Sequence, residues 1–183
     1  MNQKADQHVD WAPNPQLQSL STVGTQEYRD SMRSVAAAVT IITARHEMQQ
    51  AGLTATAVVS VTAEPPRLAV FINKNVVAAN VIMKSGALCV NVLTRYQEEV
   101  AKAFAGMIEG VHGDARFGYG TWKSMVTAAP ALEDALVNFD CRIVKRYDES
   151  THHVFVCDVL ATKRHSDREA LVYLNGVFKQ VVH

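Results

Sequence analysis

The segment from Gly52 to Pro66 combines hydroxyl-bearing and small side chains and contains no lysine or arginine. Thr54, Thr56 and Ser60 occupy alternate positions, and alternate residues of an extended chain share one face. Such a face offers hydroxyls and backbone N–H groups to a phosphate or to the polar edge of a cofactor, and Gly52 and the alanines would let a ligand approach the backbone. An ordinary half-buried strand whose threonines face water has the same pattern. The segment alone leaves both interpretations open.

Two further groups of polar residues follow strand-like stretches. Asn73-Lys74-Asn75 comes directly after an apolar run, and Lys74 could supply the point charge that the first segment lacks. It could equally be a solvated lysine of a turn. His152 and His153 are adjacent, so on a strand they would point to opposite faces. A strand histidine is more often structural than functional, and these residues by themselves assign no role.

Composition limits the function classes open to the chain. Its 183 residues carry 18 Lys and Arg against 18 Asp and Glu, which argues against nucleic-acid binding through counterion release. No apolar run reaches the roughly 18 residues needed to span a bilayer, and the polar residues 1–10 lack the apolar core of a secretory signal. We therefore expect neither a nucleic-acid partner nor a membrane location.

The cysteines and the absence of common cofactor motifs also limit the kinds of site that we expect. Cys89, Cys141 and Cys157 form no CxxC pair and lie in apolar stretches, which predicts buried reduced thiols in a cytoplasmic protein. The chain contains no HExxH, no P-loop, and no G-x-G-x-x-G after a strand. We assign no metal ion and no catalytic cysteine, and a Rossmann nucleotide domain is not expected.

The elements that must position these residues are read from hydrophobic periodicity. A flexible arm is expected over residues 1–24, rich in Gln, Ser and Pro, followed by one domain over 25–183. Strands are predicted at 39–44, 52–66, 68–72, 87–93, 135–145, 153–161, 171–174 and 177–181, and helices from Thr25, over 76–84 and over 97–105. The wholly apolar run 68–72 is expected to be buried on both faces, and 106–120 is expected to be a loop. Asn175-Gly176 between two apolar runs predicts a tight hairpin.

Many strands with few and short helices predict a mainly β fold. Closing such a sheet into a barrel removes exposed edges, so a barrel is the favoured arrangement. Any redox cofactor would then bind to a barrel and not to a doubly wound sheet.

Several separated motifs, in order, resemble one known family. They are Tyr28-Arg-Asp-Ser-Met32, Ala38-Val-Thr-Ile-Ile-Thr43, Gly52-Leu-Thr-Ala-Thr-Ala57, Ser60-Val-Thr-Ala-Glu-Pro-Pro66, Cys89-Val-Asn-Val-Leu93, Phe104-Ala-Gly106, Arg116-Phe117, Trp122, Phe139-Asp-Cys141, Thr151-His152 and Leu171-Val-Tyr173. Each motif is weak alone, but together they resemble the short-chain flavin reductases. These serve two-component flavin-dependent monooxygenases, such as those for 4-hydroxyphenylacetate and chlorophenol, and the degradation of pyrimidines.

The resemblance implies a split β-barrel with Greek-key topology that binds FMN and works as a homodimer. It implies an enzyme that oxidises NADH or NADPH, reduces FMN or FAD, and releases the reduced flavin to a separate monooxygenase. Hydride passes from the nicotinamide to the flavin, so no nucleophile, general acid or general base is assigned.

The resemblance also implies which residues contact each ligand. The flavin contacts would come from Thr54, Ala55, Thr56, Ser60, Val61, Asn73, Lys74, Asn75, Asn80, Phe104 and Ala105. The nicotinamide nucleotide contacts would come from His152, Tyr173, Leu174, Asn175 and Gly176. Relatives often carry serine where this chain has Val76, so we expect Asn80 or Lys84 to replace the missing hydroxyl.

Two other functions are weighed against this one. A non-enzymatic flavin-binding barrel that stores flavin or carries electrons would need no nicotinamide pocket, so His152 and the stretch from Leu171 to Gly176 favour the reductase. An oxidase of the pyridoxamine-phosphate type lacks support, because the chain shows no basic cluster for a second phosphate-bearing substrate.

Overall fold

The computed structural model describes residues 11–181, which divide into two compact units at the boundary between Met32 and Arg33. Before this boundary lies α1 (Pro15–Gln18), which begins with proline and is capped by the Asn14 side chain. α2 (Thr25–Arg33) begins where the sequence predicts a helix and ends at the boundary. None of the helices in the described range has the length and apolar composition needed to cross a bilayer.

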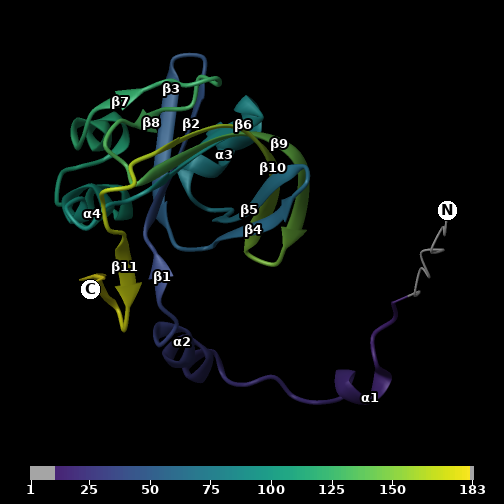
Figure 1. Cartoon of the computed structure of the whole chain (residues 1–183). Coiled ribbons are helices and arrows are strands. Elements are labelled where there is room, and N and C mark those ends of the chain that lie inside the picture. Colours follow the sequence, from purple (N-terminus) through teal and green to yellow (C-terminus); the bar gives the residue numbers. More distant parts are fainter. Residues whose placement is uncertain (1–10, 182–183) are drawn as a thin grey trace. The chain divides into compact units, whose positions relative to one another are not determined.

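The second unit is built on an antiparallel seven-stranded sheet in the order β3-β2-β6-β9-β10-β5-β4 (Figure 1). The strands are β2 (Thr40–His46), β3 (Gln49–Ala55), β4 (Val58–Ala63), β5 (Pro66–Asn73), β6 (Ala87–Val92), β9 (Val137–Glu149) and β10 (His152–Arg164). β3 and β4 form its two edges and do not pair with each other. The prediction of a mainly β fold with few short helices is confirmed, and the sheet left open between β3 and β4 is a split barrel.

Two smaller sheets complete the unit. β1 (Ala37–Ala38) pairs with β11 (Leu171–Leu174), which forms a hairpin with β12 (Val177–Gln180). Asn175 and Gly176 both have positive φ, so the predicted Asn-Gly turn is confirmed. β7 (Trp122–Lys123) pairs with β8 (Ala131–Leu132). The sequence analysis missed β1, β7 and β8, because two-residue strands have no periodicity.

The prediction of one strand over 52–66 is wrong. The chain leaves one edge of the sheet at Ala55 and joins the opposite edge at Val58, so the segment supplies both β3 and β4. The predicted burial of 68–72 on both faces is also wrong at Phe71, whose side chain is exposed. The division of 52–66 into two strands and the exposure of Phe71 both depend on pairing between strands that are distant in the sequence. A run of apolar residues carries no information about that pairing.

Two helices pack against the sheet. α3 (Val77–Ser85) lies against β2, β3 and β6, and α4 (Glu98–Ala105) lies against β3 and β2. Each ends at a glycine in the left-handed region, Gly86 at φ 66° and Gly106 at φ 73°. The predicted loop over 106–120 contains a 3-10 helix, η1 (Gly113–Gly118), that follows α4.

A buried polar network ties the centre of the sheet to β8. The Asn91 amide donates to the carbonyl of Ile41, and its carbonyl oxygen accepts from the backbone N–H of Leu132 at 2.7 Å and from Asn138 at 2.8 Å. Asn138 also donates to the carbonyl of Leu132. Because these amides are fully buried, each bond they make avoids a large desolvation cost. The network therefore fixes the position of β8 against the main sheet.

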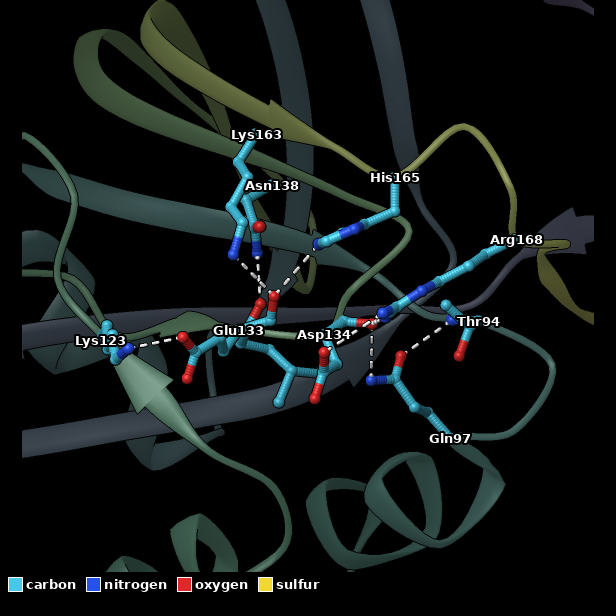
Figure 2. Close-up of polar contacts among 10 residues, drawn as sticks. Thr94, Gln97, Lys123, Glu133, Asp134, Asn138, Lys163, His165 and Arg168 are labelled. Carbon is cyan, nitrogen blue, oxygen red and sulfur yellow. Dashed lines mark hydrogen bonds and ion pairs between the residues drawn. The ribbon is translucent and has the colours of Figure 1, made fainter.

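The turn between β8 and β9 is held by side chains from distant segments (Figure 2). Lys163 and His165 direct nitrogen atoms at the carbonyl oxygen of Glu133. Arg168 and Gln97 donate to the carbonyl oxygen of Asp134. These contacts hold the carbonyls of Glu133 and Asp134 and so anchor β8, which pairs with β7, the strand that carries Trp122.

Gly52 on β3 lies unusually close to Phe104 on α4. A β-carbon at position 52 would lie 2.7 Å from Cε1 of Phe104 and 3.1 Å from Cγ2 of Thr43. Phe104 itself packs against Phe117 and Trp122, with ring centroids 5.1 and 5.3 Å away. Glycine is therefore required here by packing against an aromatic ring, in addition to any approach by a ligand.

Gly52→Ala is expected to lower the free energy of unfolding by about 1–3 kcal/mol, because the new methyl group overlaps the Phe104 ring. Urea denaturation measures the change. Gly118→Ala is the matched control, because nothing lies within 4 Å of a β-carbon there. Equal stability losses in the two variants would contradict the packing argument.

Candidate functional site

A cavity of about 670 Å³ lies over β3 at the end of the sheet where α3 begins and α4 ends. Its lining residues are Gln49, Gln50, Ala51, Gly52, Leu53, Thr54, Asn75, Val76, Val77, Ala78, Phe104, Ala105, His112, Gly113, Asp114 and Arg116. Its size lies within the range of small-molecule sites, roughly 300–1,000 Å³. Apolar side chains and a few polar groups share its walls, as in sites for large organic cofactors.

A second cavity, of about 230 Å³, adjoins the first, because Thr54 and Ala105 line both. Its other walls include Thr56 and the aromatic pair Tyr173 and Phe178, whose ring centroids are 5.3 Å apart. The structure thus brings a segment assigned to the flavin next to Tyr173, which was assigned to the nicotinamide. Such a small, largely apolar space suits an aromatic ring.

The hydroxyl of Thr54 is already engaged within the protein. Its Oγ1 donates to the carbonyl oxygen of Ala101 at 2.6 Å, joining β3 to α4. Thr56 lies beyond the end of β3, is exposed, and its hydroxyl makes no hydrogen bond to any residue in 11–181. Of these two threonines, only Thr56 has a hydroxyl proton free to donate to a ligand, while Thr54 Oγ1 can still accept.

The loop after β5 presents one of its polar residues to the larger cavity. The side chain of Asn73 accepts from the backbone N–H of Asn75 at 2.9 Å, and Asn75 lines the cavity. Lys74 turns elsewhere, because its Nζ donates to the carbonyl oxygen of Ser150 at 2.8 Å. The Lys74 ammonium group is thus bonded to the turn between β9 and β10, and Lys74 does not line the larger cavity.

His152 and His153 differ in their surroundings. His153 Nδ1 contacts Asp148 Oδ1 at 2.5 Å, and its ring packs on Phe155. This hydrogen bond lowers the pKa of the Asp148 carboxyl. His152 lies opposite Asn73 in the ladder, and its Nδ1 contacts Thr151 Oγ1 at 2.8 Å. Its Nε2 makes no hydrogen bond to the described part of the chain.

Several predicted contacts do not reach the two adjoining cavities. Ser60 lines a separate apolar cavity of about 340 Å³ between β4 and β5, and Val61 is exposed on β4. Asn80 is exposed on α3, and Lys84 lies in its last turn. Neither lines either cavity, so neither replaces a hydroxyl at position 76 in this structure.

The predicted nicotinamide stretch is also divided. Tyr173 reaches the smaller cavity, and Leu174 ends β11. Asn175 and Gly176 form the exposed hairpin turn. Asn175 and Gly176 therefore have a structural role, as the turn of the hairpin between β11 and β12.

Sequence reasoning gave no role to Gln49, Gln50, His112 or Arg116, all of which line the larger cavity. Arg116-Phe117 was noted as a motif, but nothing in its local pattern points towards β3. Arg116 Nη1 lies 3.4 Å from the carbonyl oxygens of both Gly52 and Phe104. Its Nε is buried without a hydrogen-bond acceptor.

The cysteines lie outside both cavities. Cys89, Cys141 and Cys157 are buried free thiols, as predicted. Burial raises the pKa of each thiol, that of Cys157 to about 12, so all three stay protonated near neutral pH. Within residues 11–181, no group of histidine, cysteine and acidic side chains is arranged to hold a metal ion.

Comparison with known proteins identifies the domain. The sequence profile of the family described as "Flavin reductase like domain" matches residues 32–182. A protein of Agrobacterium fabrum named FMN reductase (NADH) RutF is 40% identical over 153 residues, 84% of this chain and 86% of that protein. A protein of the same name from Stutzerimonas stutzeri is 42% identical over 148 residues, 81% of this chain and 83% of that one.

A solved structure agrees with these relatives. BorF, the flavin reductase component of a bacterial two-component tryptophan halogenase, superposes with a TM-score of 0.78. It is 29% identical, and the match covers 86% of this chain and 98% of that one.

Thr54→Val is expected to lower the free energy of unfolding by about 1 kcal/mol, because it removes the hydrogen bond to Ala101 and leaves that carbonyl without its partner. Thermal and urea denaturation measure the loss. Thr54→Ser keeps the hydroxyl and should retain most of the stability, and Thr56→Val is the control. A Thr56→Val loss as large as that of Thr54→Val would contradict this assignment.

Proposed function

The chain belongs to the family of flavin reductase-like domains, and from this premise we propose that it transfers hydride from NADH to FMN and releases the reduced flavin. It is an oxidoreductase of the flavin reductase type. The observation that carries the specific proposal is the pair of adjoining cavities, of about 670 and 230 Å³, that share Thr54 and Ala105. Two ligands that must meet need adjoining spaces of this kind.

The residues around the larger cavity fit a flavin nucleotide. Leu53, Phe104 and Ala105 offer apolar surface for a ring system, and Gln50 and Asn75 offer amide groups for a polyhydroxyl chain. We assign the flavin to Thr54, Ala55, Thr56, Asn75, Phe104 and Ala105, which line the two cavities. The other predicted contacts, Ser60, Val61, Asn73, Lys74 and Asn80, line neither cavity, so any contact of theirs with the flavin would lie outside both. When bound, the flavin supplies the ring that accepts the hydride.

We assign the nicotinamide nucleotide to His152 and the stretch from Tyr173 to Gly176. Tyr173 and Phe178 form an aromatic wall of the smaller cavity, which suits a flat pyridine ring. His152 lines neither cavity, so its Nε2, which makes no hydrogen bond to residues 11–181, would bond to a part of the nucleotide that lies outside them. NADH is favoured over NADPH because the named relatives use NADH.

The reaction requires the protein to position the two ligands, and it requires no side chain to transfer a proton. One hydride leaves NADH, which becomes NAD⁺, and a solvent proton completes the reduced flavin. The chain's part is to hold both rings in reacting geometry and to keep water from the contact. Binding through amides, hydroxyls and small apolar residues is reversible, which suits a product that must leave.

A separate monooxygenase or halogenase component would receive the reduced flavin, as BorF is the reductase component of such a system. We also propose a homodimer, because edge strand β4 exposes Val59 and the next strand, β5, exposes Phe71, with relative accessibilities of 50% and 37%. Sedimentation at the mass of two 20.1 kDa chains would support it. The activity is assigned to residues 25–183 in the cytoplasm, with residues 1–24 as a flexible arm, of which 1–10 lie outside the described range.

The function is tested by following NADH oxidation by the purified protein with FMN, FAD or riboflavin. We expect turnover that depends on both the nucleotide and an added flavin. Oxidation of NADH and NADPH no faster than without protein, for every flavin, would exclude a reductase. Flavin binding without turnover would instead indicate an electron carrier.

His152→Ala is expected to raise KM for NADH by about tenfold, the effect of losing one hydrogen bond of roughly 1.4 kcal/mol, while the Kd for flavin stays within twofold. Steady-state kinetics and fluorescence titration measure the two constants. His153→Ala is the matched variant: it breaks the contact with Asp148 and should lower stability without changing KM. Loss of flavin binding in His152→Ala would contradict the assignment of this histidine to the nicotinamide nucleotide.

A further inference from the structure

The larger cavity contains one permanent positive charge. Among the described residues, Arg116 is the only lysine or arginine that lines it, beside the acidic Asp114 and the titratable His112. Lys74, on the neighbouring loop, donates to the carbonyl of Ser150 and does not line the cavity. Any anionic part of a ligand in this cavity must therefore be balanced chiefly by Arg116.

The guanidinium of Arg116 is incompletely paired. Its two bonds from Nη1, to the carbonyl oxygens of Gly52 and Phe104, are both 3.4 Å long, beyond the usual range for strong N–H···O bonds. Nε is buried with no acceptor, and Nη2 makes no hydrogen bond to residues 11–181. No carboxylate in that range forms an ion pair with it. A buried N–H without an acceptor is costly, so this arrangement is one that an incoming oxyanion would relieve.

A second positive feature lines the same cavity. Val77 and Ala78 form the first turn of the nine-residue helix α3, and both border the cavity. The residue before them, Val76, has no side-chain oxygen to cap the helix. The backbone N–H groups and the partial positive charge of the helix N-terminus therefore act on the space that Arg116 lines.

We propose that Arg116 binds the phosphate of the flavin nucleotide in this cavity and thereby makes the enzyme prefer phosphorylated flavins to riboflavin. The inference rests on the proposed function and assigns to Arg116 the charge that the sequence suggested for Lys74. The guanidinium offers Nη2, which has no hydrogen-bond partner within residues 11–181 and, unlike Nε, is not fully buried, as a charged donor to a phosphate oxygen. FMN and FAD share this chemistry, and riboflavin lacks it.

The competing role for Arg116 is structural. Its contacts with Gly52 and Phe104 join β3 to the C-terminal end of α4, where a positive charge is favourable. A purely structural arginine would affect stability and the binding of all flavins alike. Only a phosphate-binding arginine changes the ratio between FMN and riboflavin.

The test measures the Kd of FMN and of riboflavin by flavin fluorescence for the native protein, Arg116→Gln and Arg116→Lys. Arg116→Gln should reduce the preference for FMN over riboflavin by about tenfold or more, the usual effect of a lost charge-assisted hydrogen bond. Arg116→Lys should retain part of the preference, because it keeps the charge but not the fork. Arg164→Gln, an exposed arginine outside the cavity, is the matched control and should leave the ratio unchanged.

An unchanged ratio in Arg116→Gln overturns the proposal, with or without a fall in melting temperature. If that variant does not fold, the native protein decides: inorganic pyrophosphate should compete with FMN but not with riboflavin, and failure to compete overturns the proposal. Both outcomes are independent of turnover. A protein that prefers FMN through Arg116 but does not oxidise NADH would refute the reductase function and leave the phosphate site standing.

Discussion

The ring of Phe104 occupies the space where a side chain on residue 52 would begin, and the arrangement of the site depends on this contact. It lets α4 lie directly on β3, so that Thr54 can reach the carbonyl of Ala101 and Arg116 can reach the carbonyls of Gly52 and Phe104. A larger residue at position 52 would push the helix outward. The shape of the larger cavity then follows from packing between two apolar elements.

The rest of the fold holds that contact in place. The Phe104 ring is enclosed by Phe117 and Trp122, and Trp122 belongs to the small sheet that the buried Asn91 and Asn138 join to the main one. A buried amide network has few alternative arrangements, because each unpaired donor or acceptor is costly. The cationic side chains around Glu133 and Asp134 secure the same region from the surface (Figure 2).

The residues that line the larger cavity suit the proposed release of reduced flavin. Most of its lining is neutral, with hydroxyl and amide groups, so a flavin can be bound by several weak contacts and still dissociate. The proposed role of Arg116 concentrates the electrostatic part of binding at one residue. Arg116 would then set the affinity for the phosphate, and the other lining residues would set the geometry of the reacting rings. The affinity could thus be low enough for the reduced flavin to dissociate without any change in that geometry.

Hydrophobic periodicity, the Asn-Gly dipeptide and the ordered motifs are local signals, and they were enough to predict the family, the mainly β fold, helices α3 and α4 and the hairpin between β11 and β12. The sequence also pointed to Thr54, Asn75, Phe104 and Ala105, which the structure gathers around one cavity. Three features became visible only in the folded chain: residues 52–66 contribute to both edges of the sheet, Lys74 donates to the turn between β9 and β10, and Arg116 faces β3. These are matters of which distant groups meet, and strand pairing and helix packing settle them over separations that no local pattern records.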